Sequence, residues 1–266
     1  MEMHMKRFLG GVAVAGLSAC GGSSGDVVLG PGDVVDGTVA ISYDPDTAAV
    51  TLNGNSVVDP RDTLLATKGD ARLFASGVPT HRSALAENTD AYAIVVATDN
   101  LAPEFVGAAY GRRDETVLPD GSATFSGDYA GLTVFQRPSN NDLITSMLTG
   151  DVAMTVDFDD SSLSGSITNR EVLRPTGVDF AAYDADDVII SGGTIAANGT
   201  FTAATSGGAF ISALAGETWS TGAGTASGVL AGADGETAAG ILRILHTETV
   251  GGDDFAEVGA FIATAD

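Results

Sequence analysis

The sequence predicts an all-β protein, in which an eight-stranded antiparallel β-barrel follows a smaller β subdomain. Apolar residues alternate with polar ones at period two along many short runs, and Gly, Asn and Asp occupy the positions between the runs. The 35 glycines of this 266-residue chain are dispersed among apolar and Thr-rich runs, which indicates turn-rich β structure rather than a linker. No window carries a sustained helical period, and only the runs at 60–66 and 141–148 are candidate short helices.

The first residues have the organisation of a signal peptide. Lys6 and Arg7 provide a positive region, and an apolar stretch of 12 residues follows from Phe8 to Ala19. A helix that spans the hydrocarbon core of a membrane needs about 20 residues. The stretch therefore predicts a targeting signal and not a permanent transmembrane helix.

The string Leu-Ser-Ala-Cys that ends at Cys20 resembles the lipobox of bacterial lipoproteins. This resemblance implies that residues 1–19 are removed as a signal peptide and that Cys20 is lipidated, with palmitate as an acyl group, and anchored in a bilayer. Gly21, in place of the Asp that retains lipoproteins at the inner membrane, favours delivery to the outer membrane. Met1 and Met5 both leave the signal intact as start codons.

Residues 20–26 read as a flexible polar tether. The tether matches G-x-S-x-G, but a catalytic serine in that motif needs a strand before it and a helix after it. Cys20 is the only cysteine in the chain, which excludes an internal disulfide and a cysteine-based metal site.

The predicted strands follow in two groups. Residues 27–86 contain a hairpin pattern at 38–43 and 48–54 and a further β pattern at 63–77, and they predict a small β subdomain. Residues 87–266 predict the barrel: about eight strands at regular spacing begin at Phe105, and closure leaves no strand edge exposed. The predicted strands of this second group, with one preceding run, are 91–98, 105–111, 123–135, 151–158, 161–168, 199–206, 225–232, 238–245 and 256–265.

Five strings in this second group resemble the barrel domain of the transferrin-binding protein B family of surface lipoproteins. They are FSGDYAGLTVF, LTGDVAMTVDFDDSSLSGSITN, GTFTAATSG, SGVLAGADGETAAGIL and VGAFIATAD. The residues that carry the match are Phe158, Gly165, Ile167, Gly228, Glu236, Ala239, Gly240, Gly259, Ala260 and Phe261. The resemblance implies a small handle subdomain, residues 27–86, before one eight-stranded barrel, residues 87–266, where the full receptor has two lobes.

The same resemblance implies a function in capture at the cell surface. The expected ligand is an iron source, either an iron-carrier protein or haem, or a related solute. The partners that it implies are a host or environmental iron or haem protein and a TonB-dependent receptor. No resident cofactor is expected, and haem enters only as a captured ligand.

The charge of the chain limits its partners. It has 12 basic and 35 acidic residues, and removal of Glu2, Lys6 and Arg7 with the signal leaves 10 and 34. A surface this negative repels phosphate backbones, so a nucleic-acid partner is excluded. A basic protein, a cation, or a saline environment that rewards solvated carboxylates remain open explanations.

Few residues offer site chemistry. His81 and His246 are the weak candidates for ligand binding as haem ligands, with a structural histidine as the alternative reading of each. The tyrosines are expected to pack rather than to ligate; they are Tyr43, Tyr92, Tyr110, Tyr129 and Tyr183. Acidic groups near residues 157–160, 184–187 and 253–254 fit no calcium-loop pattern and predict turn carboxylates rather than a metal site.

No nucleophile has an adjacent base at a recognisable spacing, so we expect a binding protein and not an enzyme. The first hypothesis is a surface-exposed outer-membrane lipoprotein that binds an iron source for uptake. The alternative is an acidic structural or adhesion lipoprotein without a small-molecule ligand. A third reading, a barrel that holds a lipid, depends on whether its lumen is empty.

Overall fold

A computed structural model shows an all-β protein. The structure describes residues 27–28, 41–52, 56–58, 61, 63–77, 80–98, 106–136, 143–176, 179–209, 211–212, 217–218, 222–247 and 254–266. Cys20 and the residues predicted to form the signal peptide and the tether lie outside these ranges. Within them, no helix is long and apolar enough to cross a membrane. The two predicted short helices are wrong, because residues 63–66 and 143–148 are strand.

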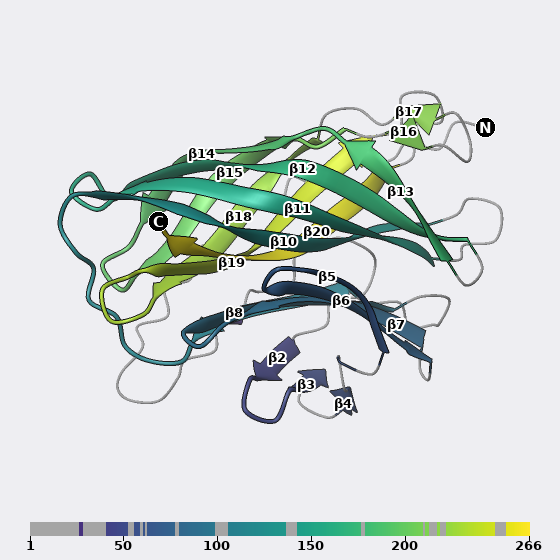
Figure 1. Ribbon diagram of the computed structural model, residues 1–266, viewed down its shortest axis with the longest axis horizontal. Helices are drawn as coiled ribbons and strands as arrows, with labels where there is room; N and C mark the ends of the chain where they lie inside the picture. The colour runs from purple at the N-terminus through teal and green to yellow at the C-terminus, as the bar shows by residue number, and fades with distance from the viewer. Residues whose placement is uncertain are drawn as a thin grey trace, which may run out of the picture.

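The barrel is closed and antiparallel (Figure 1). Its eight strands are β10 (Ser122–Gln136), β11 (Leu143–Asp157), β12 (Ser162–Thr176), β14 (Val188–Ile195), β15 (Thr200–Gly207), β18 (Gly222–Ala231), β19 (Thr237–Thr247) and β20 (Asp254–Ala265). The hydrogen-bonded order is β11-β10-β20-β19-β18-β15-β14-β12, and pairing of β11 with β12 closes the ring. The predicted all-β class and eight-stranded barrel are therefore confirmed.

One barrel strand was missed by the sequence pattern. β14 contains Gly192 and Gly193, and the strand continues through them as a bulge against β15. Gly192 has a φ of +60°, a conformation that glycine adopts without steric cost. The strand β13 (Asp179–Ala185) precedes β14 and pairs with the other half of β12.

A six-stranded sheet, the handle sheet, is formed by strands that precede the barrel in the sequence, and it lies below the barrel in Figure 1. Its strands, in spatial order, are β1 (Val27–Val28), β9 (Val106–Arg112), β8 (Ala91–Thr98), β7 (Thr80–Glu87), β6 (Ala71–Gly77) and β5 (Thr63–Lys68). β8 and β9 follow the expected boundary at 86/87, but β8 pairs with β7 and β9, and β9 pairs with β8 and β1, so neither strand pairs with a strand of the barrel. The first of the eight strands counted from Phe105 thus belongs to this sheet, and β14 takes its place in the barrel.

A three-stranded sheet, β2 (Ile41–Asp44), β3 (Ala49–Leu52) and β4 (Ser56–Val58), lies beside the handle sheet on the side away from the barrel (Figure 1). Tyr43 and Tyr92 meet edge to face there, with ring centroids 5.1 Å apart. A short pair, β16 (Ile211–Ser212) and β17 (Glu217–Thr218), completes the described strands.

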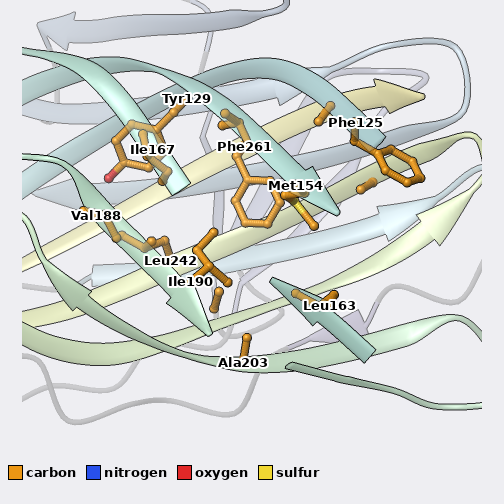
Figure 2. Close-up of a cluster of buried hydrophobic side chains, with 14 of the residues drawn as sticks. Phe125, Tyr129, Met154, Leu163, Ile167, Val188, Ile190, Ala203, Leu242 and Phe261 are labelled. Atoms are coloured by element: carbon orange, nitrogen blue, oxygen red, sulfur yellow. The ribbon is translucent and has the colours of Figure 1, made fainter. Parts of the chain in front are cut away.

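The barrel interior is packed with apolar side chains. Figure 2 shows Phe261, Met154, Leu242 and Ile190 converging from different strands. Each of them is at least 97% buried. The described interior is therefore filled by side chains, which argues against the lipid-holding reading that required an empty lumen.

A second apolar cluster joins the handle sheet to the outside of the barrel wall. It contains Leu73 and Val95 from the handle sheet and Leu132 and Val258 from the barrel, and alanines make up much of the rest. Small side chains let the two sheets approach closely. As a consequence β20 is buried on both faces, with Phe261 inside the barrel and Val258 against the handle sheet.

Candidate functional site

The most unusual chemistry in the described chain lies inside the barrel. Tyr129 on β10, Arg170 on β12, His246 on β19 and Glu257 on β20 point inward, and each is at most 1% exposed. Charged side chains are almost never buried this completely unless they are paired. We call these four residues the buried quartet.

Glu257 is the centre of the buried quartet. Its Oε1 atom accepts hydrogen bonds from Nη2 of Arg170 at 2.5 Å and from the hydroxyl of Tyr129 at 2.7 Å. Its Oε2 atom lies 3.5 Å from Nε2 of His246. Nη1 of Arg170 also donates to the carbonyl oxygen of Asp186, between β13 and β14. The carboxylate of Glu257 on β20 therefore links three other strands of the barrel, β10, β12 and β19.

A bulge in β12 turns Arg170 inward. Leu163 and Ile167 face the core, and strict alternation would place Asn169 inside and Arg170 outside. Opposite Gly150, β12 instead has two residues, Asn169 and Arg170, and Asn169 has a φ of +48°. The extra residue reverses the phase of the strand, so Arg170 points into the barrel.

Glycines provide the space that the quartet occupies. A Cβ at Gly150 would lie 3.1 Å from Cγ of Arg170 and 2.8 Å from Cγ2 of Ile167. A Cβ at Gly259 would lie 2.3 Å from the ring of Tyr129, and one at Gly131 would lie 2.4 Å from its hydroxyl oxygen. The ring of Tyr129 therefore lies over the backbone of β10 and β20 at Gly131 and Gly259, where neither strand has a side chain.

The charges of the quartet stabilise each other. Burial by itself would raise the pKa of Glu257, but Arg170, His246 and Tyr129 favour the carboxylate and bring that pKa down to about 2. Burial and the neighbouring Glu257 raise the pKa of the Tyr129 hydroxyl well above its usual value. Burial would lower the pKa of Arg170, and the charge of Glu257 raises it. The quartet therefore holds an ionised Glu257 and Arg170 beside a neutral Tyr129 at physiological pH.

The two histidines that the sequence singled out are not brought together. His246 is fully buried in the quartet, and His81 lies on β7 of the handle sheet with 3% exposure. Haem ligation needs an imidazole that a flat porphyrin can reach. In this conformation neither side chain offers such a surface.

The tyrosines and acidic groups mostly have structural positions. Tyr43, Tyr92, Tyr110 and Tyr129 are buried, and the side chain of Tyr183 lies outside the described part. Burial raises the pKa of Tyr110 to about 12. At the end of β11, Asp157 accepts a hydrogen bond from the amide of Asp160, which stabilises the turn.

An open depression of about 380 Å³ lies beside the β12 bulge, lined by Asn169, Arg170, Glu171, Asp184, Ala185 and Asp187. Its rim is acidic. Across the described ranges, no three or more His, Cys, Asp and Glu side chains are arranged to hold a metal ion. None of the residues that line the depression or form the quartet is a serine, threonine or cysteine.

Sequence reasoning missed Arg170 and Glu257. A signal for Glu257 exists, because it has the same parity as Phe261 in a strand whose residues of that parity face the core. Arg170 is an odd number of residues from the buried Ile167, so strict alternation predicts that its side chain points outward. Only the bulge turns it inward, and no sequence pattern indicates that bulge.

Comparison with known proteins gives structural matches alone. No protein-family model matches the chain, and no curated protein is significantly similar to it. Solved structures of transferrin-binding protein B from Haemophilus parasuis Hp5, a single and a double variant, are similar with a TM-score of 0.48 and identities of 13% and 12%. Each match covers 85% of this chain and 42% of the other.

The structure of intact Ap-TbpB, a transferrin-binding protein B with N and C lobes, is similar with a TM-score of 0.47 and 12% identity, over 85% of this chain and 44% of that chain. This chain thus spans less than half the length of these structures. Its own architecture is the one that the strand motifs indicated, one handle sheet beside one eight-stranded barrel.

Proposed function

We propose that this chain is a lipid-anchored lipoprotein of the outer-membrane surface that captures a protein, with an iron carrier as the first candidate. The observation that carries the proposal is the filled barrel interior, in which Phe261, Met154 and Leu242 occupy the space that a small ligand would need. A ligand then has to be taken on the outside of the barrel and handle, where a protein partner finds enough area.

The rest of the proposal comes from the sequence. The lipobox at Cys20 supports anchoring to a bilayer, and Gly21 supports outer-membrane delivery. The resemblance of the strand motifs to transferrin-binding protein B supports an iron carrier as the ligand class and a TonB-dependent receptor as the next partner. We expect haem to be a poorer ligand, because His81 and His246 are both buried.

Binding to intact cells tests the ligand. Cells that express the full chain are incubated with labelled iron-loaded transferrin, and purified lipoprotein is titrated with haemin while its absorbance is recorded. We expect saturable binding of transferrin to the cells and no sharp Soret band when the purified lipoprotein is titrated with haemin. A Soret band that is lost in His81→Ala or His246→Ala would replace the iron-carrier proposal with haem capture.

Labelling with palmitate tests the anchor. Wild-type chain is expected to incorporate the label, and Cys20→Ser is expected to lose it and to leave the signal peptide uncleaved. Protease added to intact cells then distinguishes a surface lipoprotein from one that faces the periplasm, because only the former is digested.

The charge favours a second candidate, an acidic coat or adhesion lipoprotein. The net charge of -23 keeps such a surface solvated and repels like-charged surfaces. This candidate would be preferred if cells that lack the chain lose adhesion or salt tolerance while iron uptake from every tested carrier stays unchanged.

A further inference from the structure

One face of the barrel wall has no charged side chain. It lies on the side of the barrel away from the handle sheet (Figure 1), and it consists of the outward-facing residues of 162–168 in β12, 188–195 in β14, 200–207 in β15 and 223–227 in β18. These four ranges contain no Asp, Glu, Lys or Arg, and most of their outward-facing residues are Ser, Thr or Ala. We call this surface the uncharged face.

The absence of charge is specific to this part of the barrel wall. On β10 and β11, the outward positions include the carboxylates of Asp128, Asp151 and Asp157. Charged residues make up 18% of the chain, and its net charge is -23. Carboxylates are well solvated on a free surface, but they oppose contact with another acidic molecule, because like charges repel. The composition of the uncharged face therefore fits a surface that an acidic molecule covers.

Two large aliphatic side chains project from one row of residues at this face. Ile189 on β14 and Leu245 on the adjoining β19 are 49% and 48% exposed, and they are two of the four large hydrophobic residues that are exposed in the described part of the chain. Ile189 pairs with Ser206 on β15. Ala223 on β18 pairs with both Ser206 and Leu245, so the row runs across four neighbouring strands.

The row has a shape that an opposing surface can fit. Neighbouring strands are about 4.8 Å apart, so Ile189 and Leu245 are separated by about 14 Å. The side chains of Ser206 and Ala223 between them are small and exposed. Side chains of a second surface can therefore pack between the two aliphatic side chains and remove them from water.

The charge of the chain favours a second copy as the occupant. Two copies with a net charge of -23 each repel one another wherever carboxylates face carboxylates. At the uncharged face two copies can approach without opposing any charges. A two-fold contact uses the same patch on both molecules, so the row from Ile189 to Leu245 meets the same row of the second copy.

Other occupants fit this face less well. A basic protein is attracted to the carboxylates elsewhere on the surface and gains nothing from a face that has none. The outward-facing residues of the uncharged face include no aromatic ring on which a sugar or a nucleobase could stack.

We propose that the uncharged face is a self-association surface, on which a second copy of this chain docks through a two-fold contact. With a strand spacing of about 4.8 Å and a rise of about 3.3 Å per residue, the face and the adjoining β19 span roughly 500 Å² on each copy. The total of about 1,000 Å² is at the lower limit for a specific interface, so the dimer is weak and forms as the concentration rises. This contact does not depend on the capture of an iron carrier.

Sedimentation velocity of the full chain, in a detergent matched to the density of the buffer, provides the test. The mass is expected to shift from one copy toward two as the protein concentration is raised about 100-fold. Added NaCl is expected to favour the dimer, because salt screens the repulsion between two acidic copies. A single copy at every concentration, or a dimer that salt dissociates, contradicts the proposal.

Two matched pairs of variants locate the contact. Ile189→Ser should weaken self-association at least about 10-fold, whereas Leu64→Ser on β5, where the side chain is 54% exposed, should associate like the wild type. Thr202→Glu places a carboxylate on the uncharged face and should also weaken the dimer, and Thr67→Glu on β5 makes the same change outside the face. Thermal melts verify that all four variants fold. The proposal is wrong if the two members of either pair associate equally.

Cross-linking in cells tests the same contact where the chain is made. Ser206→Cys and Thr67→Cys each add one cysteine to a chain that otherwise has only Cys20, and the wild type reports any reaction of Cys20 itself. A bismaleimide is expected to produce a dimer with Ser206→Cys and not with Thr67→Cys. Equal amounts of dimer from the two variants, or none from either, would contradict docking through the uncharged face.

Discussion

Nη2 of Arg170 lies 2.5 Å from Oε1 of Glu257, and neither side chain is exposed to solvent. β12 and β20, which carry these residues, are not neighbours in the barrel, so the pair bridges its interior. Two charges removed from water are tolerated because each also has a further partner, Asp186 for the guanidinium and Tyr129 for the carboxylate.

Removal of Arg170 alone should be strongly destabilising. Arg170→Met leaves Glu257 charged and buried, and loss of one partner of a buried pair costs about 3–5 kcal/mol. Urea unfolding measures the change, with Arg243→Met on the same barrel as the control. The double variant Arg170→Met with Glu257→Leu should recover most of the loss. Equal effects of Arg170→Met and Arg243→Met would show that the pair contributes nothing.

Acid should weaken the fold through Glu257. Its pKa is about 2 in the folded protein and near 4.5 when unperturbed. The stabilisation is therefore complete above pH 4.5 and is lost as the pH falls toward 2, and its size is on the order of 3 kcal/mol. Glu257→Gln should flatten this part of the stability profile relative to wild type. Glu171→Gln, an exposed change on β12, should leave it unchanged, and an equal flattening there would contradict the assignment.

Gly259 should not tolerate a side chain. Gly259→Ala places Cβ 2.3 Å from the Tyr129 ring, so the ring must move and its hydrogen bond to Glu257 must weaken. We expect a loss of about 1–3 kcal/mol, as for other overpacked cores. A double-mutant cycle with Tyr129→Ala measures the coupling, which should be close to zero only if the ring does not contact this glycine.

Apolar packing, and not surface charge, should hold the handle sheet on the barrel. Nζ of Lys68 lies 2.6 Å from Oδ1 of Asp151 across the interface, but the two side chains are 27% and 42% exposed. Lys68→Met should therefore cost less than about 1 kcal/mol. Leu73→Ala, in the buried interface, should cost about 2–5 kcal/mol. Calorimetry checks both values, and separate unfolding transitions of handle and barrel in the wild type would contradict a shared apolar cluster.

The alternating strands were predictable because each repeats one simple relation between side-chain polarity and burial. Val152, Met154 and Val156 face the core as their period-two pattern indicates. The alternation predicts that the barrel has eight strands, but it does not predict which of the strands belong to the barrel. Short β hairpins in the handle sheet and in the barrel carry the same pattern, so nothing local assigns Val106–Arg112 to one sheet or the other.

The buried quartet was less predictable because it depends on departures from alternation. His246 was identified by residue type alone, and its partner Glu257 lies on the next strand in the chain. Arg170 points inward only because Asn169 adopts a positive φ. The bulge depends on how β12 pairs with its neighbouring strands, and the local sequence of one strand does not indicate it.

β20 pairs with β10, which lies more than a hundred residues earlier, and with β19. It also supplies Glu257 to the interior and Val258 to the handle interface. The native structure therefore has a high contact order, and β20, the barrel strand that comes last in the sequence, contributes to both apolar clusters. Both apolar clusters contain residues of β20, so neither can be completed during synthesis before this strand has been made.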